Sequence, residues 1–189
     1  MNAVSVDPVR HRFTVDEYYR MGDAGVFGEG DRVELLGGEI IQMSPIGSLH
    51  AAAVNRLNRL FTAALGNRAV VSVQNPVRLG NLSEPEPDVA VLRPRPDFYA
   101  AAHPRPDDVW LIVEVADTTI GWDRRVKRPL YAAAGIPEVW IVDLGQRAVE
   151  VATGPRPDGY AQVRRAEQGD TLAPGALGDI VVTVSDLVG

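Results

Sequence analysis

Alternating and continuous apolar runs divide the chain into short strands separated by turns. Valine and isoleucine dominate several of these runs, and glycine, proline or asparagine lies between them. The glycine pair Gly37-Gly38 joins the first two runs and predicts a β-hairpin. The predicted strands are 32–36, 39–43, 69–73, 88–92, 109–115, 138–143, 147–152, 160–166 and 180–184, and residues 77–79 resume the strand pattern after a proline.

Three stretches have helical character. Thr14 is a suitable N-cap for a short helix over 15–21, and Ser48 is a suitable N-cap for a longer helix over 49–65 with apolar residues at helical spacing. A third helix contains 127–134. Pro129 lies inside that pattern, so the helix either starts just before it or is kinked there.

The order of these elements predicts an α/β or α+β fold with a mixed sheet. The stretch 93–108 is rich in proline and charge and is expected to be a loop, which could be mobile. Residues 1–12 are expected to form a loose tail, followed by a single domain over 13–189, since a chain of 189 residues suits one sizeable core.

Composition excludes several classes of protein. The chain has no cysteine, which excludes disulfides, thiolate zinc sites and a cysteine nucleophile. No apolar run approaches the ~18 residues of a membrane span, and no signal peptide is evident, so a cytoplasmic protein without membrane contact is expected. The net charge of −6 argues against a generally basic nucleic-acid-binding surface but leaves a local basic face open.

Glu114 interrupts the most apolar strand of the chain. On an alternating strand it shares a face with Ile112 and Ala116. An unpaired charge buried there would cost several kcal/mol. The carboxylate therefore reaches solvent at the strand end, pairs with an arginine, or belongs to a functional site.

Asp88 and Glu34 raise the same question at two other strands. Asp88 opens the run that follows Pro87, where turn chemistry alone would explain it, and Glu34 would suit the solvent face of an edge hairpin. If Asp88 and Glu114 end adjacent, parallel-type strands, they lie together at one end of the sheet. Two carboxylates, a backbone carbonyl and waters suit Mg²⁺ or Mn²⁺.

Lys127 is the only lysine among nineteen basic residues. Unlike arginine, lysine has a compact ammonium whose pKa responds to burial. Lys127 could make an exposed ion pair with Asp123, four residues earlier. Near two metal-binding carboxylates, it could instead orient or deprotonate an attacking water.

Asp88, Glu114 and Lys127 resemble the Pro-Asp…(Asp/Glu)-x-Lys signature of nucleases. The wider pattern resembles the Uma2 family, also called DUF820, of restriction-endonuclease-like proteins, over residues 13–187. The resembling segments are Val33 to Glu39, Ser44-Pro45 with His50, Glu86 to Ala90, Val113 to Val115, Asp123 to Lys127, and Tyr131 to Asp143.

The resemblance implies a restriction-endonuclease-like core with a central mixed sheet flanked by helices. It implies Asp88 and Glu114 as metal ligands, with the carbonyl of Val115 as a further ligand and Glu34 as an additional acidic group. The general signature has a lysine where this chain has Ala116. In the Uma2-like pattern the following helix supplies the lysine, which fits Lys127.

Other polar residues are less firmly assigned. His50 is either a capping or surface residue or lies near the cleft, and Gln74 ends a strand close to the same edge. The arginines at 124, 125 and 128 either contact phosphates or form a solvated helix face. Trp122, Trp140 and Tyr131 are expected in the core or at an interface rather than as platforms on which bases stack.

These features lead to a hypothesis of a Mg²⁺- or Mn²⁺-dependent endonuclease that hydrolyses DNA. A non-catalytic nucleic-acid or protein-binding module with the same fold is the main alternative. A metal-dependent hydrolase of a small phosphorylated substrate is a third reading. A homodimer is plausible, because many nucleases cut two strands with two subunits.

Overall fold

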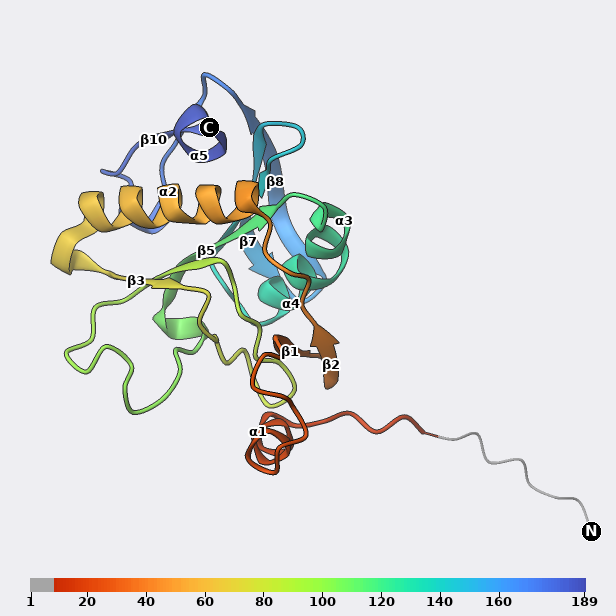
Figure 1. Ribbon diagram of the computed structural model, residues 1–189. Coiled ribbons are helices and arrows are strands. Elements are labelled where there is room, and N and C mark those ends of the chain that lie inside the picture. Colours follow the sequence, from red (N-terminus) through yellow and green to blue (C-terminus); the bar gives the residue numbers. More distant parts are fainter. Residues whose placement is uncertain (1–8) are drawn as a thin grey trace, which may run out of the picture.

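The computed structural model describes residues 9–189, and a mixed six-stranded sheet forms its centre (Figure 1). The strand order is β3-β4-β5-β6-β7-β8; β5 and β6 are parallel and all other neighbours are antiparallel. The six strands are β3 (Val70–Val73), β4 (Val89–Leu92), β5 (Val109–Ala116), β6 (Glu138–Asp143), β7 (Ala148–Arg156) and β8 (Gly159–Glu167). The prediction of an α+β fold with a mixed sheet is therefore confirmed.

Two smaller sheets and several helices complete the fold. The predicted hairpin forms its own two-stranded sheet, β1 (Val33–Leu36) with β2 (Glu39–Gln42), and lies below the main sheet in Figure 1. The second small sheet pairs β9 (Thr171–Leu172) with β10 (Val182–Thr183). The helices are α1 (Val15–Asp23), α2 (Ser48–Leu65), α3 (Ile120–Trp122), α4 (Arg128–Ala133) and α5 (Val184–Val188).

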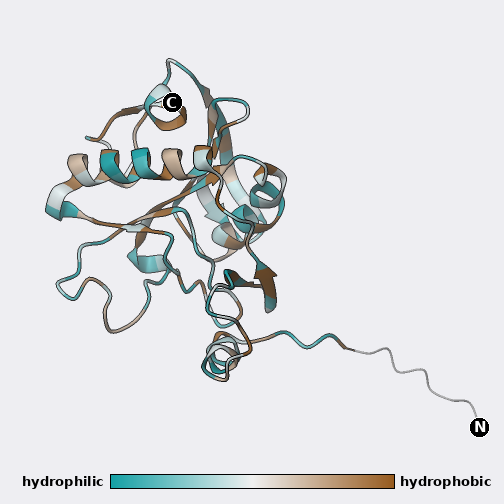
Figure 2. Ribbon diagram, in the orientation of Figure 1, coloured by the Kyte–Doolittle hydropathy of each residue, from teal (hydrophilic) through white to brown (hydrophobic). Residues whose placement is uncertain are grey.

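Apolar side chains cover both faces of the main sheet. Alternation along β5 sends Leu111 and Val113 to the face covered by α2 and α5, and Ile112 and Ala116 to the face covered by α4. Burial on both faces explains why β5 is nearly continuous in apolar residues. In Figure 2 the central strands β4 and β5 are mostly brown, whereas the long loop between them contains much teal.

Several local predictions need correction. Ser48 does not cap α2; it is the first helical residue, and Gly47 is the N-cap without a side-chain hydrogen bond. Residues 77–79 are not part of the main sheet, because their backbone N–H groups bond to the chain at 83–85 and at Pro104. The predicted strand 180–184 is too long, because only Val182–Thr183 forms a strand and α5 begins at Val184.

The helix around Pro129 begins earlier than predicted. Helical turns run from Ile120 through a π-helical turn, Asp123–Lys127, into α4. Pro129 has no N–H to donate, and it lies at the second position of α4, directly after the π-helical turn. Of the predicted tail, residues 1–8 lie outside the described residues, while Arg12 donates a hydrogen bond to the Gly37 carbonyl.

The hairpin turn offers a test of this packing. An alanine Cβ at Gly38 would lie 2.6 Å from the Cβ of Arg12, at a φ of +80°. We expect Gly38→Ala to lower the free energy of unfolding by about 2 kcal/mol or more, measured by urea denaturation. Gly37→Ala is the matched control and should cost about 1 kcal/mol, because its nearest neighbour is 3.4 Å away. Equal losses would contradict this account.

Candidate active site

Antiparallel pairing of β4 with β5 brings two carboxylates together. Val89 pairs with Val113, so Asp88, just before β4, lies beside Glu114 near the end of β5. The predicted parallel-type arrangement is wrong. Asp88 stands at the start of its strand, and only in an antiparallel pair does the start of one strand lie next to the end of the other.

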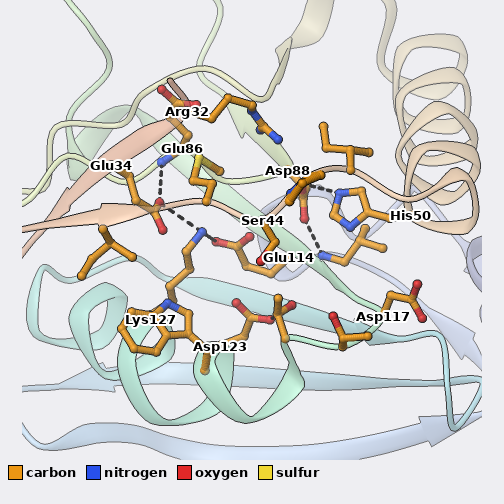
Figure 3. A pocket seen from close by; sticks show the side chains of 18 of the residues that line it. Arg32, Glu34, Ser44, His50, Glu86, Asp88, Glu114, Asp117, Asp123 and Lys127 are labelled. Atoms are coloured by element: carbon orange, nitrogen blue, oxygen red, sulfur yellow. Dashed lines mark hydrogen bonds and ion pairs between the residues drawn. The ribbon is translucent and has the colours of Figure 1, made fainter. Parts of the chain in front are cut away.

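Three donors hold Asp88 in place (Figure 3). Its Oδ2 accepts from the Val115 N–H at 2.8 Å, and its Oδ1 lies 2.8 Å from His50 Nε2 and 3.3 Å from Gln74 Nε2. His50 comes from the first turn of α2 and Gln74 follows β3. The hydrogen bond to Asp88 raises the pKa of His50, although burial opposes the rise. Both residues thus lie at the cleft and orient a carboxylate.

Lys127 lies between two carboxylates from different parts of the chain. Its Nζ is 3.2 Å from Glu34 Oε2 and 3.2 Å from Glu114 Oε1 (Figure 3). The three side chains are nearly buried, with exposed fractions of 6% for Lys127 and 3% for each glutamate. The alternatives of a solvent-facing Glu34 and an exposed Lys127–Asp123 pair are therefore wrong. Burial by itself would lower the pKa of Lys127, but the surrounding carboxylates outweigh it and raise that pKa, so the ammonium stays charged.

Glu114 is the buried carboxyl group whose pKa the cluster shifts most clearly. Burial raises its pKa from 4.5 to about 8; Lys127 opposes the rise, and the negative charges of Asp88 and Asp123 add to it. The Tyr131 hydroxyl donates to Glu114 Oε1 at 2.6 Å. Tyr131 is a core residue, as expected, but its hydroxyl also orients a site carboxylate.

Removing this hydroxyl should affect function more than stability. If Glu114 holds a metal ion, as the resemblance implies, Tyr131→Phe should lower metal affinity and any metal-dependent cleavage by about 10-fold or more, because a group that orients a ligating carboxylate is typically worth that much. The loss in free energy of unfolding should be about 1 kcal/mol. Tyr160→Phe is the control, since its hydroxyl donates to the Ile136 carbonyl at 2.8 Å and Tyr160 does not line the site. Equal effects on cleavage would contradict the assignment.

The cluster forms the floor of a cavity of about 570 Å³. The cavity is bounded by the β1–β2 hairpin and the segment after it, the start of α2, the end of β5, and the helical turns that begin at Ile120. His50, Gln74 and Arg125 all line it. Trp122 also lines it, which differs from the expectation of a core or interface residue.

Arg124 does not line the cavity and is a correction to the prediction. Its Nη2 lies 2.5 Å from Glu150 Oε1 and 3.5 Å from Asp143 Oδ2. Arg128 pairs with Glu150 as well, at 2.9 Å. These two arginines therefore tie the helical segment to β6 and β7, while Arg125 remains exposed at the cavity.

Sequence reasoning missed several lining residues. Arg32 and Glu86 flank Glu34, and the Glu86 N–H donates to Glu34 Oε2 at 3.1 Å. Thr119 donates to Asp123 Oδ2 at 2.9 Å. Tyr131 does not line the cavity, and its spacing of four residues from Lys127, which places the two on one helical face, was a signal for its contact with the site.

The oxygen atoms at this edge could hold a metal ion. Asp88 and Glu114 are adjacent, and the carbonyl of Val115 follows on the same strand. Within residues 9–189, no group of three or more His, Cys, Asp or Glu side chains forms a metal site by itself. Two carboxylates completed by a carbonyl and waters are nevertheless a donor set that Mg²⁺ accepts. Besides burial, the negative charges of Asp88 and Asp123 raise the pKa of Glu114, and a bound cation would offset these charges.

A mixed central sheet, with carboxylates at adjacent strand ends and a lysine that reaches them from the following helical segment, fits the class of restriction-endonuclease-like α+β proteins. The model of the Uma2 family, described as "Putative restriction endonuclease", matches residues 15–185, so the chain belongs to the Uma2 family.

The same fold occurs in a crystal structure from Anabaena variabilis ATCC 29413, a "putative nuclease belonging to DUF820". The two chains share 15% identity with a TM-score of 0.71, over 93% of this chain and 97% of the other. No curated protein sequence matches the chain. Within the described residues, no helix is both long and apolar enough to cross a membrane.

Proposed function

We propose that this protein is a metal-dependent endonuclease that hydrolyses phosphodiester bonds of DNA in the cytoplasm. The observation that carries the proposal is the position of Lys127, held between Glu34 and Glu114 on a cavity floor that also contains Asp88. Family membership supports a nuclease, and the cluster supports a hydrolytic reaction that uses a divalent cation.

Each residue has a distinct role in this reaction. Asp88, Glu114 and the Val115 carbonyl would hold Mg²⁺ or Mn²⁺, which when bound lowers the pKa of a water molecule and neutralises charge on the phosphate. Lys127 keeps its proton because its pKa is raised, so it orients the attacking water and stabilises negative charge rather than acting as a base. His50, Gln74 and Tyr131 fix the two carboxylates.

Cleavage of supercoiled plasmid tests the proposal. With Mg²⁺ or Mn²⁺, purified protein should convert the plasmid to nicked and linear forms, and excess EDTA should stop the reaction. The Asp158→Asn variant, changed in the exposed turn between β7 and β8, should cut like the wild type. The function would be rejected if cleavage persisted in EDTA, or if no DNA were cut with either metal.

The non-catalytic module remains the second candidate. It is favoured by the net charge of −6 and by the two ion pairs that already occupy Lys127. Calorimetric titration separates the two candidates, because the nuclease should bind Mg²⁺ or Mn²⁺ near millimolar concentration and the module should not. Cleavage of both DNA strands would fit a homodimer. Sedimentation equilibrium measures whether the protein forms one.

Metal binding should depend on pH through Glu114. Its pKa in the folded protein is about 8, above the ordinary 4.5, so its contribution to stability is full below pH 4.5 and is lost as the pH rises to about 8. Below pH 8 the Glu114 carboxyl group carries a proton, and a cation that binds to it must displace that proton. We expect Mn²⁺ affinity to rise about tenfold per pH unit up to pH 8 and then to level off. Titrations at pH 6, 7, 8 and 9 measure this, and a flat profile would remove Glu114 from the ligand set.

A further inference from the structure

The reactive groups lie at the bottom of the cavity and not on an open surface. Asp88, Glu114 and Lys127 are all nearly inaccessible to solvent, although all three line the cavity. A phosphodiester bond can meet them only by entering the cavity. In Figure 3 the carboxylates of Glu34, Asp88 and Glu114 and the ammonium of Lys127 gather in one region of this space.

The size of the cavity limits what can enter. Its volume of about 570 Å³ falls within the ~300–1,000 Å³ typical of sites that enclose one small ligand. One nucleotide with its flanking phosphates suits that space. A B-form duplex does not, because its major groove alone is ~12 Å wide.

The walls offer an apolar surface to a base. Ile41, Met43 and Pro45 line the cavity from the second hairpin strand and the segment after it, and Trp122 lines it from α3. Trp122 is partly exposed, whereas Trp140 is fully buried. Stacking of a base on an accessible aromatic ring is worth ~1–3 kcal/mol and is independent of base identity.

The charges of the cavity disfavour a long track of phosphates. Duplex-binding surfaces gain affinity from many lysine and arginine contacts to the backbone. Here Lys127 is already paired, which leaves two guanidinium groups, Arg32 and Arg125, among the described lining residues. The carboxylates that line the same space are Glu34, Glu86, Asp88, Glu114, Asp117 and Asp123.

We infer that the cavity binds an unpaired nucleotide, so that the substrate is single-stranded DNA or a duplex with unpaired positions. The base lies against Trp122 and the apolar hairpin wall, and its phosphate reaches the floor at Asp88 and Lys127. This inference rests on the proposed function for cleavage, but binding of a single strand can be measured without turnover.

Binding is measured first, without metal. An oligothymidine should quench tryptophan fluorescence of the wild type, and Trp122→Phe should lose most of that quenching. Fluorescence anisotropy should show that Trp122→Ala binds the oligothymidine at least about tenfold more weakly than the wild type does. Phe98→Ala, an exposed aromatic in the loop between β4 and β5, is the control and should bind like the wild type. Quenching that is unchanged in Trp122→Phe would overturn the inference.

Cleavage is then compared on one labelled sequence, as a single strand, as a perfect duplex, and as a duplex with an unpaired bubble. With Mn²⁺, the single strand and the bubble should be cut at least tenfold faster than the duplex, and cuts should fall at unpaired positions. Equal rates on all three would refute the inference and leave the nuclease function standing. Trp122-dependent binding without cleavage of any DNA would support the inference and refute the nuclease function.

Discussion

Lys127→Met is expected to lower the free energy of unfolding by about 3–5 kcal/mol at pH 7. The ammonium is the partner of two buried acidic side chains, Glu34 and Glu114, and removing it leaves the Glu34 carboxylate buried without its counter-charge, while Glu114, with its pKa of about 8, is largely protonated at pH 7. The same change should reduce cleavage at least about 100-fold, because a preorganised charge at the reaction centre is lost. Urea denaturation measures the first effect and plasmid cleavage the second.

A double variant separates charge from packing. Adding Glu34→Gln to Lys127→Met removes the buried carboxylate that has lost its counter-charge, so part of the lost stability should return. Cleavage should not return, because no ammonium is restored. If Lys127→Met cost less than about 1 kcal/mol, the ion pairs would contribute little to the fold. If cleavage survived in a folded variant, the proposed role of the lysine would be wrong.

Asp88→Asn should abolish metal-dependent cleavage while leaving the fold in place. The substitution keeps the shape of the side chain but removes the charge that would bind the cation, so the rate should fall at least about 100-fold. An amide can still accept hydrogen bonds from His50 and Gln74, but its NH₂ group would face the Val115 N–H. That mismatch should cost about 1–3 kcal/mol.

The experiment pairs cleavage with metal titration. Asp88→Asn should lose most of its heat of Mn²⁺ binding, whereas Asp158→Asn should retain both binding and cleavage. Circular dichroism and thermal unfolding confirm that the variant is folded. Undiminished Mn²⁺ binding by folded Asp88→Asn would place the metal elsewhere and would refute the assignment of this carboxylate.

Side-chain periodicity made much of the sheet predictable. Alternation placed Glu114 on the face of Ile112 and Ala116, and the structure confirms that face. Paired glycines located the hairpin correctly. Strand direction could not be predicted in the same way, because it depends on how the long loop between β4 and β5 returns to the sheet. The parallel arrangement was therefore wrong, although it brought the correct residues together.

The contacts that complete the site were harder to predict. A π-helical turn shifts side-chain directions relative to an α-helix, so helical spacing suggested an Asp123–Lys127 pair, and only the family resemblance placed Lys127 in one site with Glu34 and Glu114. The closeness of Arg124 to Lys127 in the sequence predicted a position at the cleft. In the structure Arg124 instead pairs with Glu150 on β7 and points away from the cavity. Such competition between partners depends on residues far apart in the sequence.

The buried position of the chain's only lysine makes amine chemistry selective. Acylating reagents modify free amines, and the ammonium of Lys127 is enclosed by Glu34 and Glu114. Acylation of this amine requires a reagent that enters the cavity and an ammonium that leaves its two acidic partners. The rate of adduct formation at residue 127, followed by mass spectrometry, therefore reports the opening of one defined location without any engineered label.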